Sequence, residues 1–249
     1  MPASSVQSVE RALRVLDILR EAPASVSSLG EALGITAPGA TKILRTLEEM
    51  GLVRRGANRT YRLAAGVCGY ARAYLRQVGL TEAARPALLD LSRATGNHTI
   101  LAVLEGVDQV NVLRVDASRG WQHPDSELPE RVGPALPQAT GRVLLAHVSP
   151  GVLAAHLDAY PLARYGGGLN DVAALAAELA AIRRQGHAVV SPSCRDVQFV
   201  AAPVQAASGT VLAAAGAHVR PNQDVNDTVR LVREAAAVIA RELGTESRP

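Results

Sequence analysis

The chain's only lysine, Lys42, lies in a segment whose polar and apolar residues recur with the period of a helix. One set at this spacing is small or polar, namely Pro38, Thr41, Lys42 and Arg45. A second set is apolar, namely Ala40, Ile43, Leu44 and Leu47. One face of such a helix packs on a core, and the opposite face stays polar. A cationic face without bulky or acidic side chains can enter the major groove of DNA, so the segment predicts a DNA-reading helix.

The elements around this helix are expected in the order of a helix-turn-helix followed by a wing. A first helix is expected over Gln7–Glu21, and its inward residues are expected to be Val9, Leu13, Leu16 and Leu19. A short second helix should end at Gly34, and Thr36 should cap the cationic helix. Two strands joined by a tight turn should then form the wing, over Leu52–Arg55 and Thr60–Leu63.

The residues expected to contact DNA come from the outer face of the cationic helix and from the wing. They are Pro38, Gly39, Thr41, Lys42, Arg45, Arg55, Asn58 and Arg59. The missing side chain of Gly39 would let the helix sit close to the bases, and Arg59 could reach phosphate or the minor groove.

The charge distribution favours the same partner. Residues 1–64 hold nine Arg or Lys and six Asp or Glu, whereas the other residues carry 17 of each sign. The whole formal net charge of +3 therefore lies on the segment with the helix-turn-helix pattern. A local excess of positive charge beside such a motif indicates a polyanionic partner, which we take to be double-stranded DNA.

Length and composition exclude several other classes of protein. The 249 residues suffice for one large domain or two ordinary ones. No apolar run approaches the ~20 residues that span a bilayer, and the N-terminus lacks a secretory pattern, so a cytoplasmic protein without a membrane partner is expected. Cys68 and Cys194 lie far apart without metal-site spacing, so they predict free thiols and no metal.

The rest of the chain predicts a linker helix over residues 66–80 and then an α+β domain. The linker has an apolar side for a partner chain or for the second domain. In that domain helices pack on an antiparallel sheet, whose strands are expected at His98–Glu105, Gln109–Val115, Ala188–Ser191, Val197–Val204 and Thr210–His218. Residues 120–136 are expected to form a loop that leads to a helix near Ala139–His147.

The order of these elements and several short motifs resemble the IclR family of bacterial transcriptional regulators, over nearly the whole chain. The N-terminal motifs are QSVERALRVLDIL and GLVRR with YRL after it. The C-terminal motifs are LSRATGNHTILAVLEG, GRVLLA from Gly141, LAAIRRQGHAV and AAPV from Ala201.

The resemblance implies a fold class and a mode of action. It implies an α+β protein with a winged helix-turn-helix domain over residues 1–65, a linker helix over 66–80, and a GAF-like effector domain over 81–249. It also implies homodimers or homotetramers that bind a short palindromic operator, as a repressor or an activator, under the control of a small organic effector.

The resemblance places the effector between the sheet and the loops 135–141 and 194–199. The residues carried over are Gln138, Ala139, Thr140, Cys194, Asp196, Phe199, Gly216 and His218. The first amides of the helix after Gln138 could receive an anionic group. Phe199 and His218 should lie on adjacent strand positions. Core packing is the alternative to ligand contact for Phe199, and an ordinary hydrogen-bonded histidine is the alternative for His218. An apolar site with few polar groups suggests a small aromatic or carboxyl-bearing effector.

An enzyme is the main alternative, because some methyltransferases carry a winged-helix domain. Those enzymes need a GxGxxG-type turn between a strand and a helix, whereas the glycine cluster 166–168 follows Tyr165 in an expected loop. A hydrolase elbow of the form GxSxG is also absent. An architectural DNA binder would leave the second domain unexplained. We therefore expect a regulator without catalytic residues or a cofactor.

Overall fold

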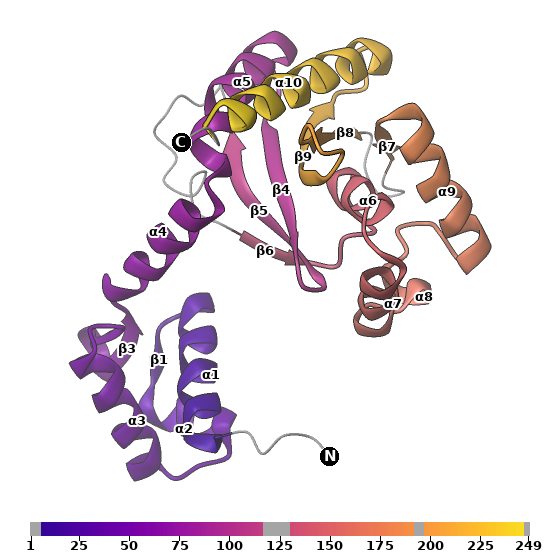
Figure 1. Cartoon of the computed structure of the whole chain (residues 1–249). Coiled ribbons are helices and arrows are strands. Elements are labelled where there is room, and N and C mark those ends of the chain that lie inside the picture. The colour runs from indigo at the N-terminus through magenta and orange to yellow at the C-terminus, as the bar shows by residue number, and fades with distance from the viewer. Residues whose placement is uncertain (1–5, 117–129, 192–196, 247–249) are drawn as a thin grey trace. The chain divides into compact units, whose positions relative to one another are not determined.

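The computed structural model describes residues 6–116, 130–191 and 197–246. Within the chain, residues 1–77 form one compact unit and residues 78–249 form another (Figure 1). Two residues expected at the effector site, Cys194 and Asp196, lie outside the described residues.

The first unit is a small helical domain with a three-stranded antiparallel sheet of order β1-β3-β2. Its helices are α1 (Gln7–Glu21), α2 (Val26–Leu33), α3 (Ala37–Glu49) and α4 (Gly66–Val78), and its strands are β1 (Ala24–Ser25), β2 (Val53–Arg55) and β3 (Thr60–Leu63). Ser25 caps α2 through a reciprocal pair of hydrogen bonds with Ser28. Gly34 ends α2 at φ 63°, a left-handed conformation that suits glycine. These local signals fix both ends of α2, and the helix ends at the glycine that the sequence predicts.

The inward face of α1 differs from the sequence prediction. Val9 and Leu13 were expected in the core, but they are 54% and 58% exposed. Val15 is fully buried instead and Leu19 is 5% exposed. The predicted and observed stripes share Leu16 and Leu19, so helical period alone could not decide between them. The position of α1 against α2 and α3 decides it.

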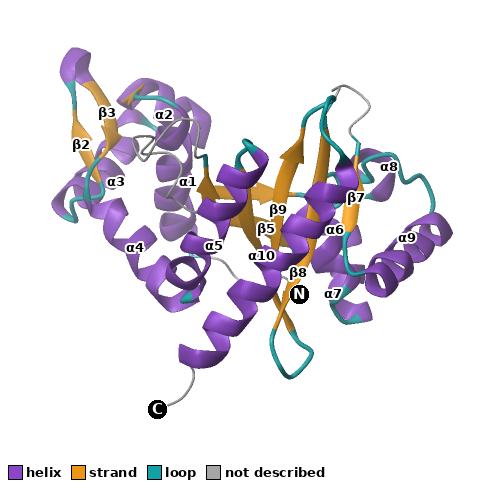
Figure 2. Ribbon diagram, turned by 90° about the horizontal axis from the view of Figure 1, so that it is seen from above, coloured by secondary structure: helices purple, strands orange, loops and turns teal. Residues whose placement is uncertain are grey.

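The second unit is built on a six-stranded antiparallel sheet of order β6-β5-β4-β9-β8-β7. Its strands are β4 (Thr99–Glu105), β5 (Asp108–Val115), β6 (Glu130–Gly133), β7 (Ala188–Val190), β8 (Gln198–Gln205) and β9 (Val211–Val219). Its helices are α5 (Leu80–Thr95), α6 (Ala139–Ala146), α7 (Pro150–Ala159), α8 (Leu162–Tyr165), α9 (Val172–Gln185) and α10 (Val225–Glu246). Helices α5 and α10 cover one face of the sheet, and α6 packs on the sheet with α9 beside it (Figures 1 and 2).

The edge strand β6 lies inside the segment that was expected to be only a loop. Its first two residues are exposed and its last two are half-buried, so it shows no alternation of apolar and polar residues. Its register with β5 also shifts between Gln109 and Val110. A short edge strand without period-2 patterning gives little sequence signal.

Asp108, the first residue of β5, is bound by two side chains from other elements. The hydroxyl of Tyr160 donates to Asp108, and Nη2 of Arg131 lies 2.6 Å from its Oδ2. The hydrogen bond to Asp108, reinforced by burial, raises the pKa of Tyr160 above its ordinary value. These contacts tie α7 and β6 to the strand from which Gln109 and Asn111 project.

Candidate functional site

Helix α3 has the two faces that its sequence predicts. Ala40, Leu44 and Leu47 are 0%, 0% and 5% exposed and belong to the inner side of the helix. The polar stripe is exposed along its length, at Pro38, Thr41, Lys42 and Arg45. The hydrophobic core of the first unit therefore holds one side of α3 and leaves the cationic side open.

Only some of the polar groups on this stripe are engaged within the chain. The hydroxyl of Thr41 donates to the carbonyl of Ala37 at 2.8 Å, so it turns back onto the helix. Arg45 Nε lies 3.6 Å from the carboxylate of Glu49. Lys42 forms no ion pair with any residue that the structure describes. Its ammonium group is therefore available for a phosphate or a base.

Gly39 lies in the first turn of α3, where Thr36 caps the helix by accepting a hydrogen bond from the Gly39 amide at 3.4 Å. A Cβ added at Gly39 would lie 3.5 Å from Thr36 Oγ1 and 3.8 Å from Ile35, which are ordinary contacts. The packing of the first unit therefore does not require a glycine at this position.

The wing ends in a strained and exposed tip. Asn58 and Arg59 both have φ 57°, in the left-handed region that costs free energy for residues other than glycine. The amide of Gly56 donates to the carbonyl of Thr60 at 2.7 Å and closes the turn. The amide of Arg55 donates to Glu48 Oε1 at 3.1 Å and ties the wing to α3. The side chains of Arg55, Asn58 and Arg59 are exposed.

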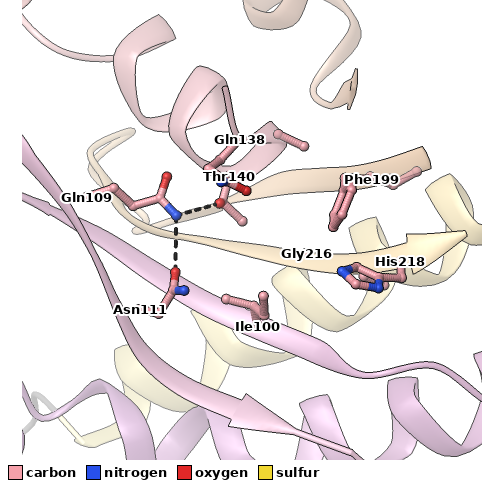
Figure 3. A pocket seen from close by; sticks show the side chains of 11 residues that line it. Ile100, Gln109, Asn111, Gln138, Thr140, Phe199, Gly216 and His218 are labelled. Atoms are coloured by element: carbon pink, nitrogen blue, oxygen red, sulfur yellow. Dashed lines mark hydrogen bonds between the residues drawn. The ribbon is translucent and has the colours of Figure 1, made fainter. Parts of the chain in front are cut away.

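A pocket in the second unit lies between the sheet and the start of α6. It encloses about 320 Å³ of empty space, including its open mouth. Its lining includes Ile100, Gln109, Asn111, Thr140, Phe199 and His218. Figure 3 shows polar groups of β5 and α6 at one end, and the Phe199 and His218 rings at the other. The lining contains no Asp, Glu, Lys or Arg among the described residues.

Strand register brings the predicted sheet residues together. Phe199 on β8 is paired with His218 on β9, as expected, and their ring centroids are 4.2 Å apart at 85°. Gly216 is paired with Ile100 on β4. A Cβ at Gly216 would lie 2.9 Å from Thr140 Cγ2 and 3.0 Å from the carbonyl of Val200. Gly216 therefore allows the start of α6 to lie close to β9.

The first turn of α6 has unpaired amides, and two of its residues, Ala139 and Thr140, line the pocket. Gln138 is the N-cap, and its side chain makes no capping hydrogen bond. The amides of Ala139, Thr140 and Gly141 have no acceptor among the described residues. Unpaired amides at a helix N-terminus carry partial positive charge and bind anions.

Arg142 holds this turn in place rather than facing the ligand. It donates to the carbonyls of Leu136 at 2.9 Å and Gly167 at 2.6 Å, and it pairs with Glu178 at 3.2 Å. The side chain of Arg142 is buried with α6. Its positive charge is therefore engaged by protein groups around the start of the helix.

The sequence prediction lacks five of the lining residues, namely Ile100, Gln109, Asn111, Val200 and Ala217. Gln109 and Asn111 are two residues apart on β5, so they point to the same face of the sheet. Two polar residues at this spacing in an apolar strand were the available signal.

Among the described residues, no group of three or more His, Cys, Asp or Glu could hold a metal ion. No helix in the described ranges is long and apolar enough to cross a membrane.

Family models match both units. The model of the IclR helix-turn-helix domain matches residues 8–57, and that of the bacterial transcriptional regulator IclR C-terminal domain matches residues 72–241. The chain belongs to the IclR family of transcriptional regulators. It therefore has a DNA-binding helix-turn-helix and a C-terminal effector-binding domain, as the sequence motifs indicate.

Several known proteins are similar along most of their length. The HTH-type transcriptional regulator XynR of Escherichia coli is 29% identical over 217 residues, which cover 84% of each chain. The Pca regulon regulatory protein of Pseudomonas putida is 29% identical over 83% of this chain and 72% of its own. An IclR homolog from Microbacterium hydrocarbonoxydans, solved as a complex with 4-hydroxybenzoate, has a TM-score of 0.78 and 25% identity, covering 96% of this chain and 99% of that one.

The geometry of the glycine cluster does not favour the methyltransferase alternative. Gly166, Gly167 and Gly168 follow the helix α8, not a strand. The cofactor-binding turn of such enzymes needs a strand before it and a helix directly after it. The relatives named above are transcriptional regulators, which are not enzymes.

Proposed function

We propose that this regulator binds a palindromic operator as a homodimer or homotetramer, and that a small organic acid in the pocket of the second unit changes its affinity for that operator. Two copies of α3 related by a two-fold axis would read two half-sites, because operator symmetry mirrors protein symmetry. The apolar side of α4, on which Tyr70 is 65% exposed, supports a contact with another protein surface.

The DNA contacts are proposed for the exposed stripe of α3 and for the tip of the wing. The free ammonium of Lys42 supplies a phosphate or base contact, and Gly39 permits close approach of the helix backbone. Arg59 at the tip of the wing would place its charge near the DNA phosphates or in the minor groove, next to the major groove that α3 enters. Pro38, Thr41, Arg45, Arg55 and Asn58 complete the proposed interface.

The proposed effector is a carboxylate with a small, flat apolar body. The observation that carries this choice is the set of unpaired amides at the start of α6, where Ala139 and Thr140 line a pocket without acidic side chains. A carboxylate would accept hydrogen bonds there, and its body would lie between Ile100 and the Phe199–His218 pair. The homologue that binds 4-hydroxybenzoate supports an aromatic acid.

The test begins with selection of duplexes from a random library by the full-length protein. We expect the recovered sequences to share an inverted repeat. Fluorescence anisotropy on that duplex, with and without benzoate or 4-hydroxybenzoate, should then show a change in operator affinity of at least about fivefold. Recovery of no common sequence would contradict the operator proposal. Flat calorimetry and unchanged thermal melts across the benzoate series would contradict the effector proposal.

A further inference from the structure

Three polar side chains at one end of the pocket form a buried hydrogen-bonded group. Gln109, Asn111 and Thr140 are 2%, 8% and 7% exposed. The Nε2 of Gln109 donates to Asn111 Oδ1 and to Thr140 Oγ1, each at 3.0 Å (Figure 3). Gln109 and Asn111 come from β5 and Thr140 comes from α6, so this group joins the sheet to the helix beside the cavity.

The two bonds from Gln109 decide which atoms its neighbours present to the cavity. An amide NH₂ group can only donate, so it occupies the acceptor oxygens of both neighbours. Asn111 therefore turns its own Nδ2 toward the cavity (Figure 3), and that atom has no partner among the described residues. Thr140 keeps its hydroxyl proton for another acceptor. The unpaired amides of α6 add further donors at the same end.

If the Gln109 amide were rotated by half a turn, the donors and acceptors of this group would exchange places. Gln109 Oε1 is buried without a hydrogen-bond partner. If the Gln109 amide turned over, its oxygen would accept from Asn111 and Thr140, their acceptor atoms would face the cavity, and Nε2 would be the unpaired atom. Either arrangement leaves one atom of Gln109 unpaired. The structure holds the arrangement that presents donors.

We infer that Gln109 is a positioning residue that sets the hydrogen-bonding polarity of the effector pocket. By fixing Asn111 and Thr140 as donors, it selects ligands that present a carboxylate to this end and rejects the matching primary amides. A primary amide would place its own NH₂ against a donor, and a buried donor without an acceptor is costly. This inference rests on the proposed function, because it assumes that the pocket holds the effector.

Two substitutions at Gln109 test the inference in opposite ways. Gln109→Glu replaces the donating NH₂ by an oxygen, so Asn111 and Thr140 must donate to it and turn their acceptors to the cavity. Gln109→Met removes both polar atoms at similar size and fixes neither neighbour. Gln205→Glu is the matched control, because the Gln205 amide also donates, to the carbonyl of Gly209 at 2.6 Å, but it is exposed at the end of β8.

The measurement is isothermal titration calorimetry of the full-length protein with benzoate and with benzamide, after thermal melts of each variant. The wild type and Gln205→Glu should bind benzoate at least about tenfold more tightly than benzamide. Gln109→Glu should reverse this order and should bind benzamide more tightly than the wild type does. Charge repulsion alone could weaken benzoate but could not strengthen a neutral amide. Gln109→Met should reduce the preference for benzoate by at least about threefold without abolishing it, because the unpaired amides of α6 remain as donors.

The possible failures are distinct. If the wild type binds neither probe, the proposed effector class is wrong and the inference falls with it. If the wild type prefers benzoate and both Gln109 variants keep that preference at its full size, the effector proposal stands and the inference is overturned. A wild type that prefers benzamide also overturns it, because the group would then present acceptors. If Gln109→Glu does not fold, the ratio measured for Gln109→Met decides.

Discussion

The first turns of α3 and α6 are built alike, but they are surrounded differently. Each has a glycine at its third helical residue, Gly39 in α3 and Gly141 in α6. A Cβ at Gly39 would make ordinary contacts, whereas a Cβ at Gly141 would overlap the carbonyl of Ala135. All eight residues of α6 are buried, whereas α3 is exposed along one face. The chain itself explains the glycine in α6, and it leaves the glycine in α3 to be explained by a partner.

The same contrast applies to the amides of the two turns. Thr36 caps α3 with its side chain, so one of its first amides is satisfied within the chain. Gln138 leaves the first amides of α6 uncapped. The exposed turn is therefore suited to present side chains to a large partner, and the buried turn is suited to present backbone donors to a small one.

The largest expected effect is that of Gly141→Ala. The added methyl group overlaps the Ala135 carbonyl, so the second unit should lose about 3 kcal/mol of unfolding free energy. Urea unfolding followed by circular dichroism measures it. Gly151→Ala in α7 is the control, because a Cβ there would have no neighbour within 4 Å. The control should be neutral or gain up to about 1 kcal/mol. Equal behaviour of the two variants would mean that α6 is not held as tightly as described.

Lys42→Ala should weaken operator binding by about 1–3 kcal/mol. If the contact is to phosphate, the slope of log affinity against log salt should also fall by about one. Anisotropy titrations at several salt concentrations measure both quantities. Arg20→Ala is the control, since Arg20 on α1 is already paired with Glu21 at 2.9 Å, and its affinity should stay close to that of the wild type. An unchanged titration for Lys42→Ala would remove this residue from the interface.

His218→Ala tests the pocket rather than the DNA face. Loss of the ring removes one side of the Phe199–His218 pair, so the change in operator affinity caused by benzoate should shrink by about 1 kcal/mol. Affinity for the operator without ligand should stay the same. Titrations of the variant with and without benzoate separate the two effects. A parallel loss of both would assign His218 a structural role.

Gly39→Ala should have the smallest effect, and its two readouts should move in opposite directions. Alanine in a helix interior stabilises the first unit by about 0.5–1 kcal/mol, because the new methyl group meets only ordinary contacts. Operator affinity should fall by about 1 kcal/mol because the helix can no longer approach as closely. Thermal melts and anisotropy give the two values. Unchanged affinity would mean that the glycine has no role in close approach.

Features that depend on neighbouring residues were well predicted from the sequence. The caps and faces of α3 follow from Thr36, Pro38 and a strict helical spacing, so they appear where expected. The pairing of Phe199 with His218 follows from a short hairpin between two clear strands. The family resemblance supplied the start of α6 as part of the pocket, which periodicity alone could not have assigned.

Features that depend on packing between distant segments were not predicted from the sequence. The inward stripe of α1 depends on where α2 and α3 meet it, so Val15 replaced Val9 and Leu13 in the core. Gln109 contacts Thr140, 31 positions further along the chain, only because α6 packs on the sheet to which β5 belongs. The role of Gln109 therefore had no local signature beyond an unusual pair of polar residues in an apolar strand.

The most direct test of control by a small acid is one titration on one duplex. The full-length wild type, bound to its selected operator, is titrated with benzoate and 4-hydroxybenzoate while anisotropy reports the bound fraction. We predict that operator affinity changes by at least about fivefold as the pocket fills. An acid that binds the protein in calorimetry and leaves operator affinity unchanged would contradict the link between the pocket and the DNA face.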